Sequence, residues 1–168
     1  MLANSEILLD AFCNAVGDLV ECYGGVKPET TLTENSTDQH DFTAIIGMCD
    51  EALSASIALT TNADTVRGMS RIPLANLVDW LGELSNQLAG RYKNKLAIYG
   101  LQPRLSTPTT VTGQLLQLGA LAGEVYVFSV QWPGGSFEAQ LSLELESGLD
   151  LQEDHALASA EEGSLSLF

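Results

Sequence analysis

Two polar residues at helical spacing, Glu83 and Asn86, are the best candidates for chemistry in this sequence. Residues three apart on an α-helix are neighbours on the same side of it. An ionised carboxylate accepts hydrogen bonds and pairs with cations, whereas a neutral carboxamide both donates and accepts hydrogen bonds. On an exposed helix face, the pair could therefore contact an approaching surface together.

Both residues belong to a stretch that reads as one amphipathic helix, from Leu74 to Leu96. At about 100° per residue, its apolar residues share one side: Leu74, Leu77, Leu81, Leu84, Leu88 and Tyr92, flanked by Val78 and Leu96. The opposite side carries Asp79, Glu83, Asn86, Gly90 and Lys93. We expect this helix to bury its leucine stripe in a core and to expose Glu83 and Asn86.

The polar side of this helix has two interpretations. Glu, Asn and Lys can be there for solubility alone, and a Glu-x-x-Asn pattern is short enough to occur by chance. Two features favour a binding surface. Gly82 and Gly90 each cost a helix about 1 kcal/mol relative to alanine, which something should offset, and Trp80 is of a residue type common at contacts. We assign partner binding to Asp79, Trp80, Gly90 and Lys93.

Two segments of the chain resemble a known family. The helical run 81–90, LGELSNQLAG, and the later run 106–113, STPTTVTG, look like the CheX branch of the CheC/CheX/FliY chemotaxis phosphatases. The family motif is a helical Glu-x-x-Asn, usually followed by an Ala-Gly pair, and then a Thr-Pro-containing strand that ends in glycine. The departures from the family pattern are Ser85 and Gln87 around the asparagine, and the bulky run 91–93, Arg-Tyr-Lys. The order of elements also fits, so the resemblance implies a CheX-like phosphatase domain over residues 1–146.

The resemblance implies hydrolysis of the aspartyl phosphate of a CheY-like response-regulator receiver. Carried over onto the matching positions, Asn86 orients the attacking water and Glu83 docks to the receiver lysine. The receiver holds Mg²⁺, so no cofactor is implied for this chain. The resemblance also implies a homodimer formed by joining sheets. The alternative is a receiver-binding or assembly module of a two-component system that has kept this surface and lost turnover.

Composition and charge limit the class of protein. A chain of 168 residues, 45% of them hydrophobic, is long enough for one domain with a sizeable core. No apolar run approaches the ~18 residues of a membrane span, and the N-terminus lacks the basic region of a secretory signal. A net charge of −15 argues against nucleic acid as a partner. We expect a cytoplasmic protein whose three cysteines, Cys13, Cys22 and Cys49, are reduced.

The basic residues are concentrated around the candidate site. Six of the seven Lys and Arg residues lie within residues 67–104, where the only acids are Asp79 and Glu83. This concentration is consistent with an anionic partner surface. The dipole at a helix C-terminus also favours basic residues and accounts equally well for Arg91, Lys93 and Lys95.

The order of periodic segments predicts an α+β fold. Residues 26–39 read as a loop or irregular strand, 62–69 as a short helix, and 102–112 as an extended path interrupted by Pro108. Two long helices and two hairpins complete the chain: helices at 4–23 and 74–96, hairpins at 41–60 and 124–146. We predict a pseudo-symmetric duplication of helix-strand-strand units, with the long helices packed on an antiparallel sheet.

Other candidate features are weaker. Residues 147–168 contain acids and no Lys or Arg, and read as a flexible acidic C-terminal tail. His40, Asp41, Asp50 and Glu51 could in principle supply metal ligands, but their spacing matches no known template. We therefore expect no metal site.

Overall fold

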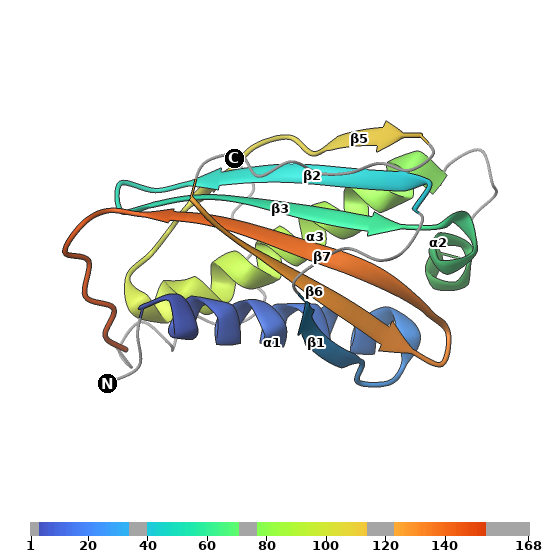
Figure 1. The fold of residues 1–168 in the computed structure, drawn as a ribbon, viewed down its shortest axis with the longest axis horizontal. Coiled ribbons are helices and arrows are strands. Elements are labelled where there is room, and N and C mark those ends of the chain that lie inside the picture. The colour runs from blue at the N-terminus through green and yellow to red at the C-terminus, as the bar shows by residue number, and fades with distance from the viewer. Residues whose placement is uncertain (1–3, 34–39, 71–76, 114–122, 154–168) are drawn as a thin grey trace.

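The computed structural model describes residues 4–33, 40–70, 77–113 and 123–153. It consists of three helices packed on a seven-stranded antiparallel sheet (Figure 1), which confirms the predicted α+β class. In chain order the elements are α1 (Asn4–Gly24), β1 (Glu29–Thr33), β2 (Phe42–Cys49), β3 (Leu53–Thr61), α2 (Ala63–Ser70), α3 (Leu77–Leu96), the 3₁₀ turn η2 (Ala97–Tyr99), β4 (Arg104–Leu105), β5 (Thr109–Thr112), β6 (Glu124–Trp132) and β7 (Gly135–Leu145).

The sheet is built from two hairpins that meet at its centre. The strand order is β1-β6-β7-β3-β2-β4, and β5 also pairs with β2. The strands that precede each hairpin cross to the hairpin of the other half, since β1 pairs with β6, and β4 and β5 both pair with β2. The two halves are thus equivalent about the central β3–β7 pair. The predicted duplication is confirmed, and each half contains at least one strand more than the helix-strand-strand unit.

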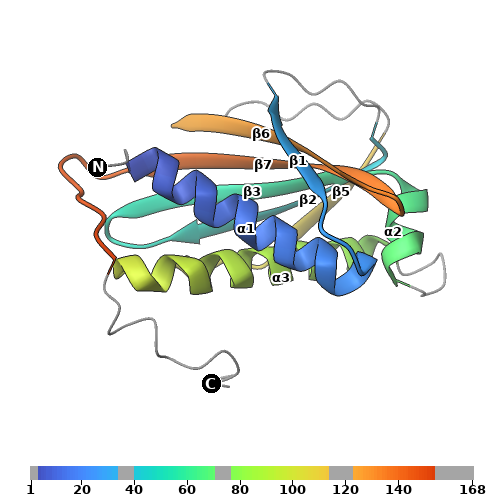
Figure 2. The ribbon, with the colours of Figure 1, turned by 90° about the horizontal axis from the view of Figure 1, so that it is seen from below.

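Helices α1 and α3 run antiparallel along one side of the sheet (Figure 2). The predicted leucine stripe of α3 is buried: Leu77, Leu81, Leu84 and Leu88 are each at most 3% exposed. The first residues of the predicted helix, 74–76, lie outside the described residues. No helix in the described part of the chain is long and apolar enough to cross a membrane.

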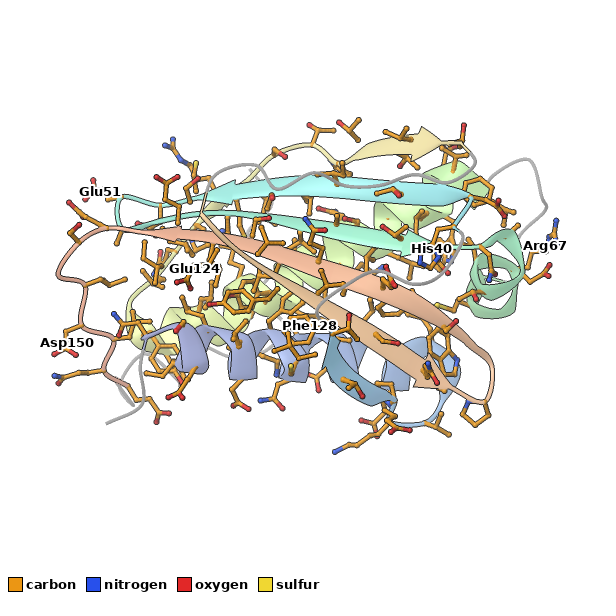
Figure 3. The ribbon with its side chains drawn as sticks, viewed as in Figure 1. His40, Glu51, Arg67, Glu124, Phe128 and Asp150 are labelled. Atoms are coloured by element: carbon orange, nitrogen blue, oxygen red, sulfur yellow. The ribbon has the colours of Figure 1, made fainter. Side chains whose placement is uncertain are left out.

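An aromatic cluster joins the two long helices to the sheet. The Phe12 ring on α1 lies edge-to-face with Tyr92 on α3, with centroids 5.3 Å apart, and 5.5 Å from Phe128 on β6. Figure 3 labels Phe128 on β6. Such aromatic pairs contribute about 0.5–1.5 kcal/mol beyond their buried area. The cluster therefore helps to set the rotation of α3, and with it the direction in which its polar side faces.

The Tyr92 hydroxyl is buried without a hydrogen-bond partner among the described residues. A buried polar group without a partner is destabilising, so Tyr92→Phe should leave the free energy of unfolding at neutral pH unchanged or raise it by up to about 1 kcal/mol. Chemical denaturation of both proteins measures this difference. A clear loss of stability in the variant would mean that the hydroxyl has a partner, such as a buried water.

The same substitution should change the pH dependence of stability. Burial raises the pKa of Tyr92, so above about pH 10 the folded state keeps a proton that the unfolded state releases. That contribution to stability is present at lower pH and is lost as the pH rises. Wild type should therefore lose more stability than Tyr92→Phe between neutral pH and about pH 11. Parallel losses in the two proteins would contradict this assignment.

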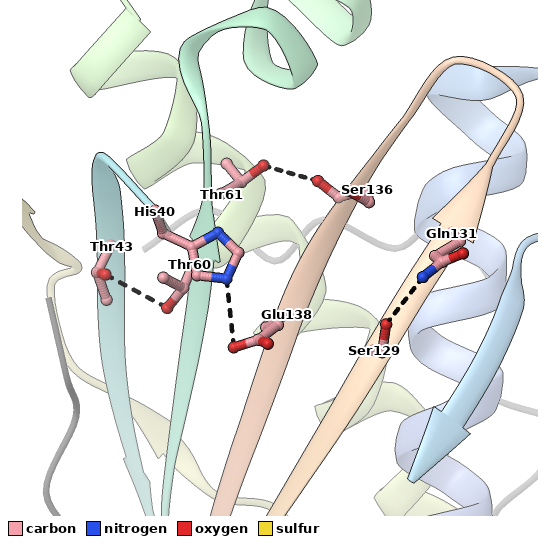
Figure 4. A network of polar contacts seen from close by, with 8 residues as sticks. All are labelled: His40, Thr43, Thr60, Thr61, Ser129, Gln131, Ser136 and Glu138. Atoms are coloured by element: carbon pink, nitrogen blue, oxygen red, sulfur yellow. Dashed lines mark hydrogen bonds and ion pairs between the residues drawn. The ribbon is translucent and has the colours of Figure 1, made fainter. Parts of the chain in front are cut away.

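A polar cluster lies on the sheet face opposite the helices (Figure 4). Thr43 Oγ1 donates to Thr60 Oγ1 at 3.3 Å, and His40 Nε2 lies 3.3 Å from Glu138 Oε2. His40 and Glu138 are 5% and 8% exposed. Buried ionisable groups need partners. This contact links the segment that leads into β2 to β7, which lies two strands away in the sheet.

The four residues considered as metal ligands do not come together. His40 and Asp41 precede β2, whereas Asp50 and Glu51 follow it, and an eight-residue strand spans about 26 Å. Figure 3 shows His40 and Glu51 toward opposite ends of the sheet. Across the described ranges, no three His, Cys, Asp or Glu side chains are grouped to hold a metal ion.

The chain after β7 returns to the start of α1. The Asn4 carboxamide donates to Leu149 O at 2.6 Å and accepts from Leu151 N at 3.2 Å, and Leu151 is 5% exposed. The beginning of the predicted acidic tail therefore packs against the domain. Residues 154–168 lie outside the described part of the chain.

The three cysteines are free. Cys22 and Cys49 are exposed, and Cys13 is half-buried. Burial, and then the nearby Asp10 carboxylate, raise the pKa of the Cys13 thiol. Cys13 thus stays in the thiol form, which is a poor nucleophile.

Candidate functional site

The polar side of α3 faces away from the core. Asp79, Glu83 and Asn86 are exposed, and Gly90 and Lys93 are half-buried. This follows from the leucine stripe, because burying that side of a helix turns the residues on the other side outward. The expectation that Glu83 and Asn86 are exposed on the same side is confirmed.

The Asn86 side chain is available to a ligand. Within the described residues, its carboxamide makes no hydrogen bond to another residue. Its neighbour Ser85 is fully buried, as is Leu88, so the helix cannot rotate without disturbing the core. The backbone at Asn86 is held in place while its oxygen and amide group remain open to water.

Glu83 is held by a hydrogen-bonded chain that crosses from α3 to α1. Gln87 Nε2 donates to Glu83 Oε1 at 2.9 Å, and Tyr23 Oη donates to Gln87 Oε1 at 2.7 Å. In the sequence, Gln87 is recognisable only as a departure from the family pattern, and Tyr23 is not among the predicted site residues. The spacing of Gln87, one turn after Glu83, was a usable signal. No local signal connects Tyr23 to Gln87, which are 64 positions apart.

Trp80 has a structural role besides any contact with a partner. Its ring lies edge-to-face with Tyr23, with centroids 5.5 Å apart and an interplanar angle of 87°. The indole is half-buried, and its N–H has no hydrogen-bond partner in the part of the chain described. Part of its surface therefore packs between the two helices, and the remainder borders the polar side of α3.

The two glycines of α3 differ in their reason for being there. A Cβ on Gly82 would lie 3.3 Å from Thr110 Oγ1, so this glycine allows β5 to approach the helix closely. A Cβ on Gly90 would meet nothing within 4 Å. Packing within the chain therefore explains Gly82 but not Gly90. Gly90 leaves open space beside Asn86, one turn further along the helix.

Some of the basic residues are already paired. Lys95 Nζ lies 2.7 Å from Asp18 Oδ2 on α1, and Arg67 Nη1 lies 2.6 Å from Asp64 Oδ1 on α2. Figure 3 shows Arg67 at the outer side of α2. Lys93, by contrast, has no ion pair with any described residue. The positive charge available on the polar side of α3 is thus smaller than the count of basic residues indicates.

The arrangement limits the chemistry of this surface. It presents one oriented carboxylate and one free carboxamide, about one turn apart on a rigid helix. These groups can bind a cation and orient a water molecule. They include no hydroxyl or thiol nucleophile, and the described residues provide no metal-binding cluster beside them.

The sequence matches no protein-family model and no curated protein. The structure does match solved structures. A CheC-like superfamily protein from Shewanella sp. PV-4 superposes with a TM-score of 0.71 at 18% identity, covering 82% of this chain and 97% of that one. The chain has the CheC/CheX fold.

Two further structures support the assignment of the CheX fold. The chemotaxis protein CheX from Vibrio vulnificus has a TM-score of 0.70 at 17% identity, over 82% of this chain and 99% of that one. A CheX–CheY–BeF₃–Mg²⁺ complex from Borrelia burgdorferi has a TM-score of 0.70 at 15% identity, over 81% of this chain and 97% of the matched one. At these identities the likeness establishes the fold alone.

Proposed function

We propose that this chain binds a phosphorylated CheY-like receiver domain and hydrolyses its aspartyl phosphate. The observation that carries the proposal is the joint exposure of Glu83 and Asn86 on α3 of a CheX fold. The CheX from Borrelia burgdorferi was solved with CheY, BeF₃ and Mg²⁺, which supports a receiver as the partner of this fold.

The reaction requires little chemistry from this chain. An acyl phosphate is labile, and the receiver holds its own Mg²⁺ and lysine, so positioning a water in line with the phosphorus is sufficient. The water oxygen forms a bond to phosphorus as the bond to the aspartyl oxygen breaks, releasing the receiver carboxylate and inorganic phosphate. We assign the positioning to Asn86, whose Oδ1 accepts a hydrogen bond from the water. A neutral carboxamide adds no negative charge near the phosphoryl oxygens.

Glu83 has a different role in this proposal. Its carboxylate pairs with the receiver lysine beside the phosphoryl group in a charge-assisted hydrogen bond. Asp79, Trp80, Gly90 and Lys93 form the rest of the docking surface. The chain needs no cofactor of its own, because the metal ion belongs to the receiver.

Homodimerisation is part of the proposal through the family resemblance. Strand β1 pairs with β6 on one side, and Leu32 on β1 is 56% exposed. A sheet edge of this kind can accept a further strand from a second copy. Sedimentation at several concentrations tests whether dimers form.

A titration tests the partner. Adding a receiver loaded with beryllofluoride and Mg²⁺ should shift the backbone NMR signals of α3 around Asn86 and Gly90, and leave those around the polar cluster at His40 unchanged. Receivers from the same genome are the natural candidates. Unchanged α3 signals with every receiver would contradict both the phosphatase and the binding-module interpretations.

Gly90→Ala should separate docking from stability. Alanine should raise the free energy of unfolding by about 1 kcal/mol, because a Cβ at Gly90 has open space around it. The added methyl group should weaken receiver binding by roughly fivefold if the receiver packs against this site. Gly17→Ala on α1 is the matched control, since its Cβ also meets nothing, and it should gain stability without losing affinity. Equal affinities for the two variants would remove Gly90 from the docking surface.

A further inference from the structure

We propose that Gln87 and Tyr23 are positioning residues that hold the Glu83 carboxylate in the orientation needed to dock to the receiver. This inference rests on the proposed function. It adds a residue from α1 to a site that the family motif confines to α3. It also gives a role to Gln87, one of the two departures from the family pattern next to Asn86.

The hydrogen-bonded chain has one consistent direction. The Glu83 carboxylate can only accept, so Gln87 must present its amide nitrogen to Glu83, at 2.9 Å. The Gln87 carbonyl oxygen then faces Tyr23 and accepts from its hydroxyl at 2.7 Å. Gln87 engages only Oε1 of Glu83, and Oε2 makes no hydrogen bond to any described residue, so it is available to a partner.

The far end of this chain is itself fixed. Tyr23 lies in the last turn of α1, where Gly25 adopts φ of 71° and its N–H donates to Glu21 O at 3.0 Å. The Trp80 ring packs against Tyr23 edge-to-face at 5.5 Å. Tyr23 is therefore held by both helices, and its hydroxyl can hold Gln87.

Preorganisation is the physical reason for this arrangement. A free glutamate side chain has many rotamers and loses them on docking, which weakens binding. Fixing Glu83 before the receiver arrives reduces that loss. Because the Gln87 carboxamide is neutral, it does not form an ion pair with Glu83 that would compete with the receiver lysine. A lysine at position 87 would instead pair with Glu83 at i,i+4 spacing and compete with the receiver.

The test compares substitutions by their effects on KM and kcat for dephosphorylation of a phosphorylated receiver. Gln87→Met removes both hydrogen bonds and keeps a good helix former; it should raise KM by about 3- to 10-fold and change kcat by less than about twofold. Tyr23→Phe should raise KM less, because Gln87 can still contact Glu83.

Gln87→Lys should raise KM at least as much as Gln87→Met while the protein stays as stable as wild type or becomes more stable. Tyr99→Phe, which removes a tyrosine hydroxyl that donates to Glu153 away from α3, is the control and should change neither constant.

A double-mutant cycle separates positioning from general packing. In the Glu83→Ala background, Gln87→Met should have no further effect on KM, since there is no carboxylate left to hold. An equal effect in both backgrounds would overturn the positioning role and leave the proposed function intact. A wild type that binds no receiver would instead overturn the proposed function.

The side-chain amide of Gln87 gives a readout that needs no receiver. Its NMR relaxation should report restricted motion in wild type and faster motion in both Tyr23→Phe and Glu83→Ala. An amide as mobile in wild type as in the two variants would overturn the inference, whatever the outcome of the kinetic experiments.

Discussion

Replacing Asn86 by alanine should lower kcat for receiver dephosphorylation by about 100-fold or more. The carboxamide is free to hold the attacking water, and alanine offers no group that could replace it. Receiver binding should change little, because the docking contacts come from Glu83 and its neighbours. The fold should also be unaffected, since the position is exposed and alanine is the best helix former.

Single-turnover decay of the phosphorylated receiver measures this loss directly. The matched control is Asn94→Ala, which replaces an exposed asparagine about two turns further along the same helix. With this variant, the phosphorylated receiver should decay at the rate seen with wild type. Calorimetry with the beryllofluoride-loaded receiver checks that Asn86→Ala still binds. Unchanged rates in Asn86→Ala would contradict the assigned mechanism, even if the protein is a phosphatase.

Replacing Glu83 by alanine should weaken binding to the activated receiver by about 10- to 100-fold, which is the effect of losing a hydrogen bond between charged groups. At saturating receiver, kcat should fall much less than it does in Asn86→Ala. The loss of affinity should be smaller at high salt, because an exposed ion pair is screened.

Calorimetric titration at two salt concentrations tests this prediction. Glu146→Ala removes an exposed glutamate outside α3 and is the control for the loss of one negative charge. If Glu83→Ala binds as tightly as Glu146→Ala, Glu83 is not a docking residue. Asn86 could still position the water in that case.

The exposure of the site residues could be predicted because one periodicity decides it. Leu77, Leu81, Leu84 and Leu88 recur at helical spacing, and burying them turns Glu83 and Asn86 outward. The strands of the β6–β7 hairpin were predictable for a similar reason, since alternate residues are apolar and a Pro-Gly-Gly turn separates them.

The rest depends on contacts between distant parts of the chain. The pairing of β1 with β6, and of β5 with β2, leaves no local signal, because a short Thr-rich segment can be predicted as extended without any indication of the strand that it joins. For the same reason the sequence alone could not separate the roles of Gly82 and Gly90. The Thr110 contact that accounts for Gly82 comes from a strand 28 positions away in the printed sequence.

The measurement that tests the central claim most directly is the decay of a phosphorylated receiver in the presence of this protein. Receivers from the same genome are phosphorylated, and the loss of phosphate is followed with no addition, with wild type and with Asn86→Ala. We predict that wild type hastens the decay of at least one receiver and that Asn86→Ala binds this receiver but does not hasten its decay. Binding without any hastening by wild type would contradict the phosphatase assignment and leave a receiver-binding module.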